Sequence, residues 1–164
     1  QPFSSKSYLD RMTRHQHVLL MRTLSKFGLA GVRIGYMMGP DKLINEVDKA
    51  RPPYNISILN AECALFALEH ADVFAVQAQD IQAQRSELLG ALAKMPGVKA
   101  WKSDANMILV RVPDAQKTFD ALKAQGVLIK NVSKMHPLLT HCLRLTVGTA
   151  AENSRMLTAF TSSL

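Results

Sequence analysis

Apolar residues recur along the first half of the chain with periods that predict two strands and then three helices. The strands are expected at 17–24 and 32–39, and the helices at 41–50, 57–70 and 72–95. The run HVLLMRTL predicts a buried first strand, and Gly39-Pro40 ends the second. The prolines of RPPYN (51–55) exclude a helix and a central strand, so this stretch is expected to be a loop.

After Pro96-Gly97 the pattern changes to short strands alternating with single helices. The predicted order is strand, strand, helix, strand, strand, helix, at 98–101, 106–112, 114–126, 127–131, 142–148 and 150–164. This order predicts a small α+β domain with its helices on one face of a sheet. The earlier part looks like the tail of a larger α/β sheet, which is therefore incomplete. We expect an α/β chain with domains at 1–70 and 71–164.

The composition is that of an ordinary globular protein. Of the 164 residues, 48% are hydrophobic and 20% are charged, which excludes a disordered chain. The net charge is +7, but the basic residues are scattered and form no run, so no nucleic-acid partner is expected. Because no apolar run has the length of a membrane span, no membrane partner is expected either.

The cysteines and histidines do not predict a metal site. Cys63 and Cys142 form no CxxC motif, which favours two buried free thiols and a reducing, cytoplasmic compartment. None of the five histidines is paired at a spacing of four on a helix, and no carboxylate cluster accompanies them. The expected metal content is none.

The segment RTLSKFGLAGVRIGY (22–36) carries the most specific chemistry. Hydroxyl side chains and glycine turns surround Lys26, and Arg33 stands seven residues further on. A lysine attacks as a nucleophile only as the free amine, and hydroxyls, turn amides and a guanidinium suit a phosphate dianion. A phosphate beside a lysine amine is what a pyridoxal phosphate site requires. The alternative is a surface lysine in a turn, with Arg33 paired to a carboxylate.

The same segment strongly resembles the lysine segment of fold-type I, class I/II aminotransferases, and specifically of the histidinol-phosphate aminotransferase group. The resemblance continues in order through PPYNISILNAECALFALEH, SDANMILVRVPDA and GVLIKNVSKMHPLLTHCLRLTVGTAAEN. It therefore covers nearly the whole chain. It implies a pyridoxal 5'-phosphate enzyme of histidine biosynthesis, a cytoplasmic homodimer that transfers an amino group between glutamate and imidazole acetol phosphate.

The resemblance assigns roles to five residues. Lys26 corresponds to the lysine that bonds to the cofactor and moves the proton at the substrate's α-carbon, and Ser25 and Arg33 correspond to ligands of the cofactor phosphate. Arg144 corresponds to the arginine that binds the anionic group of either substrate, and a guanidinium suits both carboxylate and phosphate. Lys130 falls where some relatives have a second anion-binding arginine, and lysine lacks the bidentate fork. The interval from Lys26 to Arg33 is also one residue shorter than in many relatives.

The remaining part of the family's site is expected upstream of residue 1. QPFSSKSY (1–8) resembles the segment that comes directly after the ring-binding aspartate and tyrosine in relatives. We therefore expect a C-terminal half that is inactive alone and folds stably only with another copy or with the missing half. The alternatives are another class I/II aminotransferase, a threonine-phosphate decarboxylase-like enzyme, or a non-catalytic dimerising fragment. Tyr54 and Asn55 either reach a site across a dimer interface or merely anchor their loop.

Overall fold

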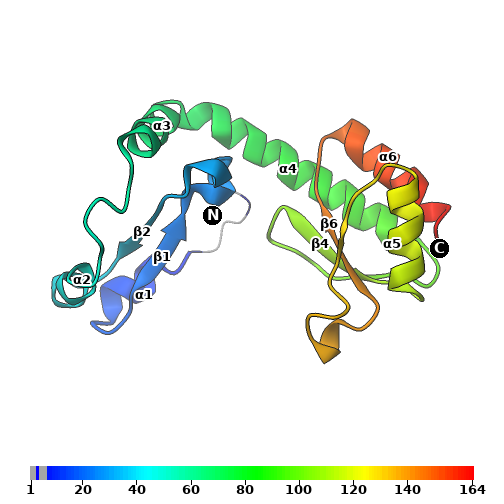
Figure 1. Ribbon diagram of the computed structural model, residues 1–164, viewed down its shortest axis with the longest axis horizontal. Coiled ribbons are helices and arrows are strands. Elements are labelled where there is room, and N and C mark those ends of the chain that lie inside the picture. The colour runs from blue at the N-terminus through cyan, green and yellow to red at the C-terminus, as the bar shows by residue number, and fades with distance from the viewer. Residues whose placement is uncertain (1–2, 4–6) are drawn as a thin grey trace. The chain divides into compact units, whose positions relative to one another are not determined.

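The computed structural model describes residue 3 and residues 7–164, in two compact units (Figure 1). The first unit comprises Gln1–Ala78 and the second Gln79–Leu164. Their boundary lies within one long helix, α4 (Ala71–Leu92). Most of the segment QPFSSKSY lies outside the described residues. The domain boundary expected at residue 70 stays a prediction.

The first unit is built on a two-stranded antiparallel sheet with short helices around it. Its elements before α4 are α1 (Leu9–Arg14), β1 (Leu20–Thr23), the 3-10 helices η1 (Leu24–Phe27) and η2 (Ala30–Val32), β2 (Gly35–Met38), α2 (Asp41–Asp48) and α3 (Ile58–Glu69). Strand β1 pairs with β2 from Leu20↔Met38 to Thr23↔Gly35. The lysine segment therefore joins the two strands of one sheet.

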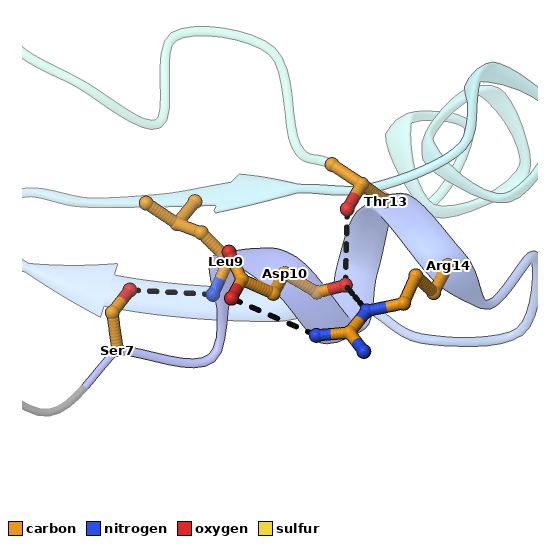
Figure 2. A network of polar contacts seen from close by, with 5 residues as sticks. All are labelled: Ser7, Leu9, Asp10, Thr13 and Arg14. Carbon is orange, nitrogen blue, oxygen red and sulfur yellow. Dashed lines mark hydrogen bonds and ion pairs between the residues drawn. The ribbon is translucent and has the colours of Figure 1, made fainter.

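Local polar contacts hold α1, which has no buried residue (Figure 2). Ser7 Oγ accepts a hydrogen bond from the Leu9 amide at 3.3 Å, ahead of the helix. The Asp10 carbonyl accepts from Thr13 Oγ1 and from Arg14 Nε, both at 3.0 Å, and the Asp10 carboxylate lies 3.6 Å from Arg14 Nη2. Each of these exposed contacts contributes little to the free energy of unfolding, and all of them join residues close together in the sequence.

Helix α3 begins where the sequence predicts, because Ser57 Oγ accepts from the Asn60 amide at 3.1 Å and caps it. Its apolar side chains are nevertheless mostly exposed. Only Ala64 and Ala67 are buried, whereas Ile58, Leu59 and Phe66 are more than 60% exposed. Two expectations were wrong here: Cys63 is exposed rather than buried, and β1 alternates between half-buried and exposed residues instead of being fully buried. Both expectations overestimated burial, because few side chains of this unit cover Cys63 and β1.

The second unit contains a four-stranded antiparallel sheet with the strand order β3-β4-β6-β5. Its elements after α4 are β3 (Lys99–Ala100), β4 (Met107–Arg111), α5 (Ala115–Ala124), β5 (Lys130–Asn131), the 3-10 helix η3 (Pro137–Leu139), β6 (Cys142–Thr146) and α6 (Ala150–Thr161). The predicted order of elements is confirmed. Figure 1 shows α5 and α6 near β4 and β6.

One face of this sheet carries the core of the second unit. Ile108 pairs with Leu145 and Val110 with Leu143, and all four side chains are fully buried. They pack with Phe160 of α6 and with residues of α4 and α5, including Leu88, Leu92 and Leu122. The opposite face carries the alternate positions of β4 and β6, where apolar residues such as Leu109 stand beside Arg111 and Arg144.

Caps define the helices of the second unit. Asp114 Oδ1 accepts from the amides of Gln116 and Lys117, both at 3.0 Å, at the start of α5. Thr149 and Glu152 form a capping box at α6, in which Glu152 Oε2 accepts from the Thr149 amide at 2.8 Å. This backbone hydrogen bond, helped by one from the Thr149 hydroxyl, lowers the pKa of the Glu152 carboxyl.

Several predicted elements are too long, for identifiable reasons. Strand β5 begins at Lys130 rather than at 127, because the Val127 amide bonds to the Leu122 carbonyl and so belongs to the turn that ends α5. Gly126, with φ of 74°, supplies the left-handed residue of that turn. Helix α2 ends at Asp48, and Pro40 rather than Asp41 occupies its N-cap. Within the described residues, no helix is long and apolar enough to span a membrane.

Candidate active site

The turn after β1 presents the hydroxyls and the amine of the lysine segment together. Thr23 is the N-cap of η1, and its Oγ1 accepts from the Ser25 amide at 3.1 Å. Thr23 Oγ1 also lies 2.9 Å from Ser25 Oγ, in a hydroxyl–hydroxyl hydrogen bond. Ser25 and Lys26 are both half-buried, on the first turn after the strand. The cap therefore fixes the backbone on which the candidate nucleophile stands.

Gly28 closes η1 and requires glycine. Its φ is 91°, and its amide bonds back to the Leu24 carbonyl. A Cβ at this position would lie 3.1 Å from the ring of Phe74, in addition to the left-handed backbone. Gly31 differs, because a Cβ there would meet nothing within 4 Å. Of these two glycines, Gly28 is thus the one that shapes the turn.

The loop after η1 returns the chain from Leu24 to Ile34. The Leu24 amide bonds to the Ile34 carbonyl at 3.0 Å and so closes the loop that carries Ser25 and Arg33. Arg33 has φ of 56°, a left-handed conformation that costs a non-glycine residue about 1 kcal/mol or more. Its guanidinium is exposed, with Nη1 donating to the Ala30 carbonyl at 3.2 Å.

This donor set fits the phosphate of pyridoxal phosphate. Hydroxyls of Thr23 and Ser25 and the guanidinium of Arg33 stand on one closed loop, and the amine of Lys26 lies on the same turn. Arginine and hydroxyl groups are the side chains that bind phosphate dianions through charge-assisted hydrogen bonds. A strained residue within such a loop supports a functional assignment.

The second unit brings Lys130 and Arg144 together. Strands β5 and β6 place Lys130 directly opposite Arg144, and β4 places Leu109 on the other side of Arg144. Both cations are exposed on the face opposite to the core. Like charges directly opposite each other destabilise a sheet, so this pair raises the electrostatic cost of the strand pairing.

One further residue of that face, Arg111 of β4, escaped sequence reasoning. It is half-buried and donates to the carbonyls of Leu138 at 2.7 Å and Thr140 at 3.1 Å. Its guanidinium lies 5.4 Å from the ring centre of Trp101. No local pattern could reveal the two hydrogen bonds, because their partners are 27 and 29 residues away along the chain.

Other candidate residues receive less support. Tyr54 is 99% exposed and has φ of 57°, and any role of Tyr54 or Asn55 across a dimer interface stays a prediction. His136 caps η3 by accepting from the Leu138 amide at 3.1 Å. In the part of the chain that the structure describes, no group of histidine, cysteine or acidic residues could hold a metal ion.

Comparison with known proteins places these features in one family. The family model described as aminotransferase class I and II matches residues 2–160. The chain belongs to this family. The histidinol-phosphate aminotransferase of Polaromonas naphthalenivorans is 71% identical over 164 residues, which are all of this chain and 45% of that protein. The chain therefore spans less than half the length of this curated relative.

Solved structures agree on the fold. The histidinol-phosphate aminotransferase of Clostridium acetobutylicum matches 96% of this chain and 49% of its own, with a TM-score of 0.87 and 19% identity. The histidinol-phosphate aminotransferase of Sinorhizobium meliloti, solved in complex with pyridoxal-5'-phosphate, matches 90% of this chain and 41% of its own, with a TM-score of 0.76 and 26% identity. The expected α/β fold of a fold-type I aminotransferase, in part, is thereby confirmed.

Proposed function

We propose that this chain supplies the lysine, a phosphate anchor and the substrate-anion site of a pyridoxal-phosphate-dependent histidinol-phosphate aminotransferase. The reaction moves an amino group between glutamate and imidazole acetol phosphate. The observation that carries the proposal is the closed loop at Lys26, which Arg33 completes in a left-handed conformation. The 71% identity to a histidinol-phosphate aminotransferase over the whole chain supports the choice of substrate.

The side chains divide the work between two anions. Ser25 and Arg33 hold the cofactor phosphate, with Thr23 setting the orientation of Ser25 through their hydroxyl contact. Lys26 would hold the cofactor through its amine and would carry the proton at the substrate's α-carbon. When bound, the cofactor supplies the electron sink that makes this proton removable.

Arg144 and Lys130 bind the anionic group of the substrate. Arg144 offers a planar fork to a carboxylate or a phosphate, and Lys130 adds a point charge from the adjacent strand. One cationic pair can therefore serve glutamate and the phosphorylated substrate in turn. We further propose that the working enzyme is a cytoplasmic homodimer, and that this chain is inactive without the remaining half of the site.

Borohydride reduction of the full-length enzyme with its cofactor, followed by peptide mapping, tests the assignment of Lys26. We expect the label on the peptide that contains Lys26 and its loss in Lys26→Ala. Lys42, an exposed lysine on α2 outside the lysine segment, is the matched control, and Lys42→Ala should keep the label. Labelling at any other lysine would overturn the proposal. The 164-residue chain with the cofactor should show no transaminase turnover.

A further inference from the structure

The connection between β5 and β6, residues 132–141, contacts the end of the second unit's sheet at Arg111 and Cys142. Cys142 lies on the same face of β6 as Arg144 by alternation, yet it is completely buried. Its Sγ lies 3.7 Å from the Thr140 carbonyl, and the Val132 amide bonds to the Cys142 carbonyl at 3.2 Å. The connection thus contacts β6 at Cys142, which is buried, whereas Arg144, two residues further along the strand, is exposed.

Arg111 fastens this connection to the sheet. It pairs with Cys142 across the strands, and its two hydrogen bonds go to carbonyls at the end of the connection, those of Leu138 and Thr140. Trp101 supports the guanidinium from the side, at 5.4 Å from the ring centre. Because the planar guanidinium of Arg111 donates to two carbonyls at once, it defines both the position and the direction of the chain that enters β6.

We propose that Arg111 is a positioning residue for the anion site at Arg144 and Lys130. It acts by holding the end of the β5–β6 connection against β4 through the Leu138 and Thr140 carbonyls. This inference rests on the proposed function of that pair. The connection joins the two strands that carry the two cations, so releasing it loosens their register, and with it the distance between the charges. Arg111 itself is committed to the two carbonyls and to Trp101, and it does not need to contact the anion.

Lys99 provides a matched control. It stands opposite Arg111 on β3, and its Nζ lies 5.2 Å from the centre of the same Trp101 ring. The contact of Lys99 with Trp101 does not involve the connection. Lys99→Met and Arg111→Met therefore remove the same charge from the same surroundings, but only Arg111→Met releases the connection. Arg111→Lys keeps the charge and loses the fork.

The first measurement is tryptic cleavage of the full-length enzyme at Lys134–Met135, within the connection. Lys134 is exposed, and cleavage there follows opening of the connection. We expect Arg111→Met to accelerate this cleavage about tenfold and Lys99→Met to leave its rate unchanged. The rate for Arg111→Lys should lie between those of Arg111→Met and the unsubstituted protein. Trp101 is the only tryptophan among these 164 residues, and its fluorescence emission should change in Arg111→Met because the ring loses its contact with the guanidinium.

The second measurement is the affinity for inorganic phosphate, by calorimetry at about 0.15 M salt in an Arg33→Met background that disables the other phosphate site. We expect Arg111→Met to weaken binding about tenfold, as loss of a supporting group commonly does, with partial rescue by Arg111→Lys and little effect of Lys99→Met. Equal weakening by Arg111→Met and Lys99→Met would reveal a mere charge effect and overturn the proposal. Faster cleavage with unchanged phosphate affinity would also overturn it.

The two measurements separate this inference from the proposed function. If the full-length enzyme with only Arg33→Met binds no phosphate, the proposed anion site at Arg144 and Lys130 fails, and the positioning role fails with it. If phosphate binds and Arg144→Ala abolishes binding, the anion site stands whatever Arg111 does. The kinetic counterpart in the full-length enzyme is a rise in KM for both substrates in Arg111→Met, larger than the change in kcat.

Discussion

Replacing Lys130 by methionine should stabilise the chain in the absence of anions. Lys130 stands directly opposite Arg144 on neighbouring strands, and both side chains are exposed. Two like charges about 6 Å apart in water repel by about 0.7 kcal/mol, and salt at about 0.15 M roughly halves this. Methionine keeps an unbranched side chain of similar reach and removes the charge. The melting temperature at low salt should therefore rise by about 1–2 °C.

Binding of an anion should reverse the sign of the change in melting temperature that Lys130→Met causes. With inorganic phosphate between the two cations, loss of Lys130 removes a charge-assisted contact worth roughly 1.5–3 kcal/mol, which exceeds the relief of repulsion. In saturating phosphate, Lys130→Met should thus melt below the unsubstituted chain. An Arg33→Met background keeps the cofactor-phosphate loop from contributing. The assay is differential scanning calorimetry at about 20 mM and about 500 mM sodium chloride, with and without phosphate.

Lys134→Met is the control for this experiment. It removes one positive charge from an exposed position in the β5–β6 connection and leaves the pair of Lys130 and Arg144 intact. Because the whole chain carries a net charge of +7, any lysine removal relieves some general repulsion. Equal stabilisation by Lys130→Met and Lys134→Met would refute the reasoning from the cross-strand pair. So would a stabilisation by Lys130→Met that persists in saturating phosphate.

Three other substitutions test the turn, the core and a helix cap. Gly28→Ala should destabilise the chain by about 1–2 kcal/mol in urea titrations because of its φ of 91° and the nearby Phe74 ring, whereas Gly31→Ala should not. Phe160→Ala, at a fully buried position, should cost about 3–5 kcal/mol in the same assay. The lowered pKa of Glu152 means that its capping contribution is present above the unfolded pKa, about 4.3, and is lost as the pH falls through the lower folded pKa. Glu152→Gln should flatten this part of the acid-stability curve, and an unchanged curve would contradict the role.

The sequence predicted the identity and order of the elements well where local signals mark them. Ser57 and Asp114 cap helices at the expected residues, and Gly126 ends α5 in the expected conformation. Burial was predicted less well. Cys63 lies in an apolar stretch but is exposed. The spacing of apolar residues cannot distinguish a helix face that packs on a core from one that the described residues of its unit leave uncovered.

The residues of the candidate site also differ in how far the sequence could predict their spatial relations. The relation of Ser25 to Arg33 is set within one short loop, so a fixed spacing in the sequence is informative. The pairing of Lys130 with Arg144 depends instead on strand register, and Arg111 acts on carbonyls almost thirty residues away. These relations come from the fold as a whole. Only the family resemblance pointed to Lys130 and Arg144, and nothing pointed to Arg111.

The short loop at Lys26 places specific demands on the residue at position 33. Two 3-10 helices and two left-handed residues, Gly28 and Arg33, carry the chain from Leu24 back to its hydrogen-bonded partner Ile34. Arg33 therefore holds its place through the backbone, at a cost of strain. A lysine at this position would accept the same backbone strain but lose the fork, whereas a glycine would relieve the strain and lose the charge. Neither residue keeps both the backbone conformation and the bidentate donor on which the proposed phosphate role of Arg33 depends.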